Sequence, residues 1–185
     1  MHIERDNRPD ALALPLEPVK LFLRVDGSHD DASIIDMIDA AARELEEAAQ
    51  LALLFQTVRV TLDSWPATHR LRLPIGPALA GGPAVTVTAA GESVTATLRP
   101  GIRPAVILDG PVPAGPVVIE YQAGFTDTPG ALPPDIVHAL RDQVAVAYDQ
   151  RAGSPQLHRL AKSTGTDGLS YAMQRCIGRY RGVIL

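Results

Sequence analysis

Cysteine is almost missing from this 185-residue chain, which contains only Cys176. One cysteine excludes an intramolecular disulfide and a cysteine-based zinc cage, and we interpret it as a small apolar residue on a helix. Aromatic residues make up only 4 % of the chain, whereas hydrophobic residues make up 46 %. The core is therefore expected to consist mainly of Ala, Val, Leu and Ile. A chain of this length can bury enough of them to fold without a metal or a disulfide.

Long apolar runs are also missing. No segment approaches the roughly 18 apolar residues of a membrane span. The first ten residues are densely charged and do not resemble a signal peptide. We therefore expect no membrane partner, and a protein that is made and used in the cytoplasm.

The chain has no excess of positive charge, since its formal net charge is −4. This balance argues against nucleic-acid binding by the chain as a whole. Segment 159–185 differs, because it has five basic residues and only one acidic residue, Asp167. A basic tail on an acidic body indicates a tail that docks on an acidic partner. A tail made basic for solubility is the alternative.

Periodicity divides the chain into an α+β arrangement. Region 15–55 is predicted to be helical, region 57–124 to form short antiparallel strands, and region 134–162 to return to helix. We predict a helical core, of two long helices plus short ones, with an inserted β region. Residues 1–14 are assigned to an N-terminal arm, 15–162 to the main domain, and 163–185 to a linker and an extended C-terminal tail that orders on a partner.

Three local patterns carry this prediction. Apolar residues recur at spacings of three and four from Ile34 to Ala52, which is typical of an amphipathic helix with a small-residue stripe. Val58, Val60 and Leu62 alternate with polar residues, as in a half-buried strand. Further on, Ala90–Glu92 predicts a hairpin turn between two strands.

The usual catalytic motifs are absent from the sequence. It has no phosphate-binding loop and no G-x-S-x-G elbow. His138 and Asp142 lie one helical turn apart but lack a third metal ligand at motif spacing. Trp65 invites a ligand-stacking role, but we interpret it as the anchor of a strand end on the core. We therefore predict no catalytic residue, no metal and no cofactor, and a protein that is not an enzyme.

Several short segments occur in a characteristic order along the chain: Val19–Asp26 with Asp30–Asp31, Gln56–Pro66, Leu71–Pro74, Tyr121–Asp127, Pro133–Ile136 and Tyr148–Arg151. Their order and spacing resemble those of phage head–tail connector proteins, the head-completion or adaptor proteins of long-tailed phages, prophages and gene transfer agents. The resemblance covers about residues 17–152, and the Gly-, Ala- and Pro-rich stretch between Pro74 and Gly101 departs from the family pattern.

This resemblance implies a structural subunit of a ring, on the order of a dozen copies, between the portal and the tail or neck. Its expected partners are the portal protein, the next neck or tail-completion protein, and double-stranded DNA that passes through the lumen without specific binding. The particle is expected to assemble in the bacterial cytoplasm. The resemblance implies portal docking by Tyr171, Arg175, Ile177, Arg179, Tyr180 and Arg181, and ring contacts at Arg43, Glu47, Arg141 and Gln150.

Two other functions stay open at this stage. One is a small enzyme with its active site in the β region, which a pocket of titratable residues with shifted pKa values would favour. The other is a monomeric module that binds peptide or carbohydrate, which a C-terminal segment folded on its own body would favour.

Overall fold

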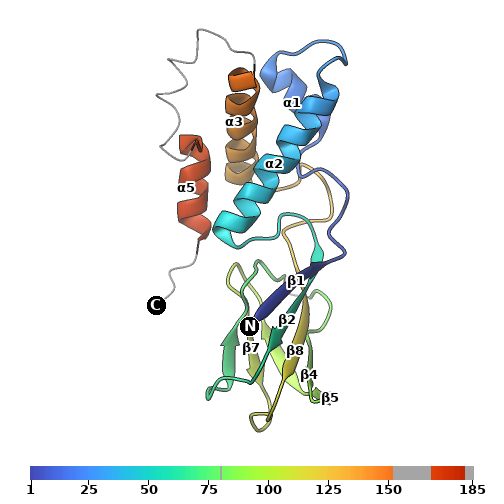
Figure 1. Ribbon diagram of the computed structural model, residues 1–185, viewed down its shortest axis with the longest axis vertical. Helices are drawn as coiled ribbons and strands as arrows, with labels where there is room; N and C mark the ends of the chain where they lie inside the picture. The colour runs from blue at the N-terminus through green and yellow to red at the C-terminus, as the bar shows by residue number, and fades with distance from the viewer. Residues whose placement is uncertain (80, 152–167, 182–185) are drawn as a thin grey trace. The chain divides into compact units, whose positions relative to one another are not determined.

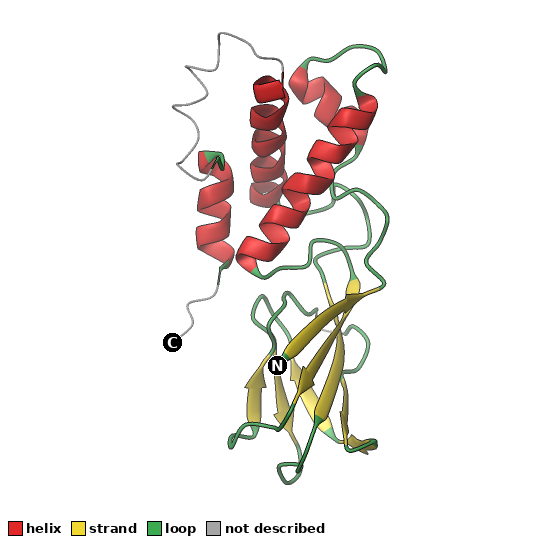
Figure 2. Ribbon diagram, viewed as in Figure 1, coloured by secondary structure: helices red, strands yellow, loops and turns green. Residues whose placement is uncertain are grey.

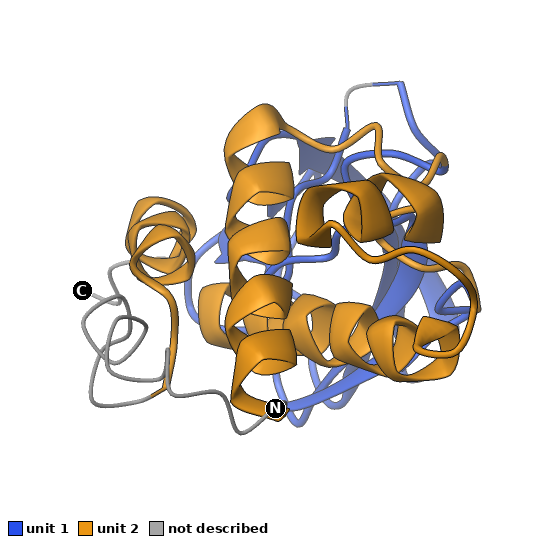
Figure 3. Cartoon of the chain, turned by 90° about the horizontal axis from the view of Figure 1, so that it is seen from above, with its two compact units in different colours: residues 1–9, 50–127 blue, residues 10–49, 128–185 orange. Residues whose placement is uncertain are grey.

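The chain folds into two units, seen in a computed structural model that describes residues 1–79, 81–151 and 168–181 (Figures 1 and 2). Unit 1 consists of Met1–Pro9 and Gln50–Asp127, and unit 2 of Asp10–Ala49 and Thr128–Leu185 (Figure 3). Unit 1 contains the strands and unit 2 the helices. The predicted α+β class is therefore confirmed, with the β region inserted into the helical part of the chain.

Helices and strands are interleaved along the chain. The helices are α1 (Leu16–Leu23), α2 (Asp31–Ala49), α3 (Pro134–Arg151) and α5 (Tyr171–Tyr180). The strands are β1 (His2–Asp6), β2 (Gln56–Leu62), β3 (Arg70–Arg72), β4 (Thr86–Ala89), β5 (Glu92–Val94), β6 (Ala96–Arg99), β7 (Ala105–Leu108) and β8 (Val117–Ala123).

Unit 1 consists of two antiparallel sheets that share one hydrophobic core. The five-stranded sheet has the order β1-β2-β8-β4-β5, and the three-stranded sheet has the order β3-β7-β6. Along β2 and β8 every second residue is buried, so one face of the larger sheet lies on the core. Val58, Ile119 and Val87 from the larger sheet and Val106 and Leu108 from the smaller one belong to the same buried cluster. The outer faces of the two sheets therefore look away from each other.

The hairpin predicted at residues 90–92 is present and joins β4 to β5. Its two-residue turn has Ala90 at φ 49° and Gly91 at φ 88°. Positive φ at both central positions is the backbone of the turns that fit the twist of a hairpin, and glycine is the residue best suited to it. The pairing between Pro74 and Gly101 is thereby settled: β4 and β5 extend the larger sheet, and β6 joins the smaller one.

Unit 2 packs its helices through apolar faces. Ile34, Ile38 and Leu45 of α2 are fully buried, at the helical spacing found in the sequence. The helix α2 contacts α1, α3 and α5, and α3 in turn contacts α1, α2 and α5. The buried side of α3 includes Ile136, Leu140 and Val144. None of the helices in the described residues combines the length and the apolar character needed to cross a membrane.

Two segments differ in form from their sequence prediction. Residues 1–14 include β1, an edge strand that pairs with β2 and that the charged sequence did not indicate. The C-terminal segment, predicted to be extended, contains the helix α5. The short helical piece predicted at Gln156–Ala161, the continuation of the predicted helix past Arg151, and the linker up to Asp167 lie outside the described residues.

Candidate assembly surfaces

The helix α5 is held on α3 by polar contacts at both ends. At its start the Ser170 hydroxyl accepts from the backbone N–H of Met173, and the Ser170 N–H donates to the side-chain oxygen of Gln143 at 2.8 Å. At its end Arg179 donates to Oδ2 of Asp135 at 2.8 Å, and the Tyr180 hydroxyl donates to Oδ1 of Asp135 at 3.2 Å. The contacts between α5 and α3 join residues 27 to 45 positions apart.

The buried side of α5 consists of Ala172, Met173, Cys176, Ile177 and Tyr180. Burial raises the pKa of the Cys176 thiol to about 11 and that of Tyr180 to about 12. The thiol is therefore protonated near neutral pH, which fits its interpretation as a small apolar helix residue. Ile177 and Tyr180, two of the residues for which the resemblance implies portal docking, are buried within unit 2. The exposed members of the predicted set are Tyr171, Arg175, Arg179 and Arg181.

A small cavity of about 170 Å³ lies between α5 and the first turns of α3. Its lining includes His138, Arg175 and Arg179 together with Asp135 and Cys176. Asp142, the other member of the predicted pair, does not line it. Within residues 1–79, 81–151 and 168–181, no group of three or more His, Cys, Asp or Glu side chains is arranged to hold a metal ion.

The four residues predicted for ring contacts lie on α2 and α3. Arg43 is exposed and pairs with Asp39 at 2.7 Å on the same helix. Glu47 lines an open hollow of about 690 Å³ with Ala40, Glu44 and Ala48. Gln150 is exposed near the end of α3.

Arg141, the fourth candidate, is half-buried on α3. Its Nε atom is buried and has no hydrogen-bond partner among the described residues. A buried donor without an acceptor is costly in a folded protein, so a partner that supplies an acceptor would be favoured.

The turn between α1 and α2 is fixed by an acidic pair. Asp30 accepts hydrogen bonds from the Tyr148 hydroxyl at 2.6 Å and from Arg151 at 2.8 Å. These two donors hold the pKa of Asp30 below its usual value. Beside it, Asp31 pairs with Lys20 at 2.7 Å. The side chain of Asp30 therefore joins the start of α2 to the end of α3.

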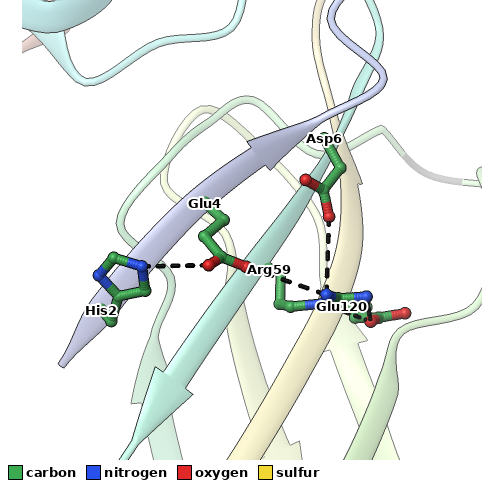
Figure 4. A network of polar contacts seen from close by, with 5 residues as sticks. All are labelled: His2, Glu4, Asp6, Arg59 and Glu120. Atoms are coloured by element: carbon green, nitrogen blue, oxygen red, sulfur yellow. Dashed lines mark hydrogen bonds and ion pairs between the residues drawn. The ribbon is translucent and has the colours of Figure 1, made fainter.

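A charged network crosses the outer face of the five-stranded sheet (Figure 4). Arg59 of β2 lies between carboxylates from both neighbouring strands. Its Nε and Nη2 atoms each lie 2.7 Å from Oε1 of Glu120 on β8. Nη1 lies 3.9 Å from Glu4 and from Asp6 on β1. Glu120 raises the pKa of Arg59, so this guanidinium stays charged at any relevant pH.

A groove of about 480 Å³ lies in the β region, between Ser93–Thr95 and Asp109–Pro113. If the protein were a ligand-binding module, its ligand would bind in this groove. Asp109 is its charged residue and accepts a hydrogen bond from Thr97 at 3.0 Å.

Comparison with solved structures covers the whole chain. A chain in the neck of an empty gene transfer agent particle, computed with C6 symmetry, has a TM-score of 0.74 and 25 % identity. A chain in the virion of a native gene transfer agent particle has a TM-score of 0.73 and 25 % identity. In each case the match covers 100 % of this chain and 97 % of the other.

These structural neighbours belong to the neck and to the virion of gene transfer agent particles. A chain in the neck of a native particle, computed with C12 symmetry, shares the fold at a TM-score of 0.72, 23 % identity and the same coverage. No protein-family model and no curated protein matches the sequence. The resemblance to phage head–tail connector proteins, first drawn from the order of short phrases, is thus confirmed by the fold of the complete chain.

Sequence reasoning missed the charged surfaces of this neck-type fold in unit 1. The Arg59 network depends on the pairing of β1 with β2 and of β2 with β8, over separations that no local pattern reveals. A signal was present in the alternation of charge in residues 2–6, where His2, Glu4 and Asp6 fall on one face of a strand.

Proposed function

We propose that the chain is a structural subunit of the neck of a phage-like or gene-transfer particle, where copies form a ring between the portal and the tail. The similarity to neck chains over the full length, at TM-scores up to 0.74, carries this proposal. Two of those necks were computed with C6 and C12 symmetry, which supports a closed ring of copies. The protein would then be a component of the particle, assembled in the bacterial cytoplasm.

Within such a ring, DNA would pass through the lumen on its way out of the head. A net charge of −4 on each subunit favours a lumen that repels phosphate and lets DNA slide without specific binding. The next neck or tail-completion protein would meet the other end of the ring. The residues proposed for contacts between copies are Arg43, Glu47, Arg141 and Gln150, of which Arg141 has a buried Nε in need of an acceptor.

Portal docking is proposed for the exposed face of α5. Tyr171 is half-exposed, and Arg175 has no ion-pair partner among the described residues. Tyrosine and arginine are enriched at protein interfaces. In a ring, every copy would repeat the same weak contact, so that the total affinity for the portal would be high. Arg179 and Arg181 extend this face, while Ile177 and Tyr180 support it from below.

The test is co-expression of the full chain with the portal protein of the same particle, followed by pull-down and negative-stain imaging. We expect ring-shaped complexes. Because α5 is part of unit 2, a truncation before it would damage the fold, so point variants are the better probe. The double variant Arg175→Glu with Arg181→Glu should lose portal binding, and the control Arg24→Glu on α1 should keep it. A wild-type chain that stays monomeric and ignores the portal would contradict the adaptor function.

A further inference from the structure

Three arginines project from the outer face of the three-stranded sheet. Arg70 and Arg72 lie on β3, and Arg99 lies on β6. The register pairs both Arg72 and Arg99 with Ala105 of the central strand β7. Residues paired directly across antiparallel strands lie on the same face, so Arg72, Ala105 and Arg99 form one row across the sheet. Arg70 lies in the next row, on the same face.

These arginines form a basic face on an acidic protein. All three are exposed, and none has an ion-pair partner among the described residues. Asp109, which follows β7 and accepts a hydrogen bond from Thr97 of this sheet, is the nearest acidic residue along the strand. With Asp109 included, the basic face has a net charge of +2. An unpaired cluster of this kind repels itself and is stabilised by an acidic partner.

The opposite outer face of unit 1 is acidic. In the five-stranded sheet the register aligns Glu4 with Arg59 and Arg59 with Glu120, which gives a row of two carboxylates around one guanidinium (Figure 4). Asp6 faces outward two residues along β1. Three carboxylates and one guanidinium leave this acidic face with a net charge of −2.

The two rows match in spacing. Neighbouring strands lie about 4.8 Å apart, so Glu4 and Glu120 are about 10 Å apart at the backbone, and so are Arg72 and Arg99. The central position of the basic row is Ala105, which is buried and uncharged, so Arg59 in the middle of the acidic row would meet no third arginine there. Each face also has one more residue with the same charge as the ends of its row. Asp6 lies on the edge strand β1 and Arg70 on the edge strand β3, each two residues along the strand from the row.

We propose that the basic face, Arg70, Arg72 and Arg99, binds the acidic face, Glu4, Asp6 and Glu120, of a second copy of this chain. The contact rests on the proposed ring and names a part of its interface that lies in the β region. Because the two faces belong to different sheets and look away from each other, the contact is head-to-tail. Such a heterologous contact propagates from copy to copy and closes into a ring when the rotation fits.

A second copy fits this face better than DNA does. The chain supplies the complementary surface itself, in equal number and at the same spacing, so every basic face in a ring has an acidic face to bind. A duplex would meet three arginines spread over two rows of a small sheet, on a subunit whose net charge is −4. Binding of DNA by this face is therefore an outcome that the test must detect.

The test uses sedimentation velocity and native mass spectrometry of the full chain at physiological salt. The basic-face variant is Arg70→Glu with Arg72→Glu, and the acidic-face variant is Glu4→Arg with Asp6→Arg. Both pairs lie on edge strands two residues apart and leave the 2.7 Å contact between Arg59 and Glu120 in place. The control is Arg24→Glu, which reverses a charge at an exposed position of unit 2 outside the contacts proposed for the portal and the ring. Circular dichroism verifies that each variant is folded.

We expect wild type and control to form rings, and each face variant to associate on the order of tenfold more weakly or not at all, because like charges then meet. The chain with all four face substitutions should form rings again. Rings that persist in both face variants would overturn this contact and leave the ring function standing. Loss of binding to a 20-base-pair duplex in the basic-face variant, with rings intact, would assign the face to DNA instead. A wild type without rings would refute the ring function and this contact with it.

Discussion

The hydroxyl group of Tyr121 on β8 links this strand to the backbone of Ile75, and both residues lie in the core of unit 1. Its oxygen donates to the carbonyl of Ile75 at 2.9 Å and accepts from the Ile75 N–H at 3.1 Å, although the two residues are 46 positions apart. The ring is 2 % exposed, and burial raises the pKa of the phenol. Both polar groups of Ile75 therefore depend on one side chain.

Tyr121→Phe is expected to destabilise the protein by about 1–3 kcal/mol, because it leaves a buried N–H and a buried carbonyl without their partner. The measurement is urea unfolding followed by circular dichroism. Tyr171→Phe removes the same hydroxyl from a residue that is 52 % exposed and should change stability by less than about 0.5 kcal/mol. Equal effects of the two substitutions would contradict the role of Tyr121.

At the residue scale, the role of a side chain could be predicted from the sequence where that role depends on neighbouring residues in the chain. Trp65 was expected to anchor a strand end, and it is buried in the core with its indole N–H donating to the Thr68 carbonyl at 2.8 Å. The row of Arg72 and Arg99 was not foreseen, because these residues come together through separate pairings with β7. Such a row depends on strand register across loops, which a single sequence does not specify.

At the element scale, periodicity identified most of the fold but left the status of α5 open. Met173, Ile177 and Tyr180 follow helical spacing and are all buried, so a signal for an amphipathic helix was present. The arginines between them favoured a docking tail instead. A helix of this length is marginal alone in water, and its packing on α3 is what stabilises it. The strand β1 escaped prediction for a related reason: an edge strand with charged outward residues lacks an apolar signature.

The cap of α5 gives a direct measure of whether this helix belongs to the fold of the free subunit. Ser170→Ala removes the acceptor for the Met173 N–H and is expected to destabilise the subunit by about 1 kcal/mol. Hydrogen exchange by mass spectrometry should show faster exchange confined to residues 171–180. Ser64→Ala, at an exposed loop position, is the control and should change neither quantity. An α5 that exchanges freely in wild type would show that it forms only on a partner.

At the scale of the whole molecule, the two units have different surfaces for assembly. In the proposed assembly, unit 2 would bind the portal through the exposed face of α5 and neighbouring copies through polar positions of α2 and α3. Unit 1 has opposite charges on opposite outer faces, which would give each copy a direction around the proposed ring. The alternative of a monomeric module drew support from a C-terminal helix folded on its own body, but that helix still exposes Tyr171 and Arg175.

This polarity leads to a prediction about mixtures. The variant Arg70→Glu with Arg72→Glu has two acidic faces, and the variant Glu4→Arg with Asp6→Arg has two basic faces. Each variant alone should associate on the order of tenfold more weakly than wild type or not at all, because the β-region contact in its ring would join like charges. Mixed in equal amounts they should assemble, since each basic copy then sits between two acidic ones. Alternation requires an even number of copies in the ring.

Native mass spectrometry of the mixture distinguishes head-to-tail contact from the alternatives, because the two variants differ in mass. Alternating rings of equal composition are expected, and their fraction should fall as salt is raised from about 0.1 M to 1 M, where screening shortens from about 10 Å to 3 Å. A two-fold contact would instead pair the basic face of one copy with the basic face of another and would give no mixed rings. Mixed rings of random composition would show that these faces do not select neighbours.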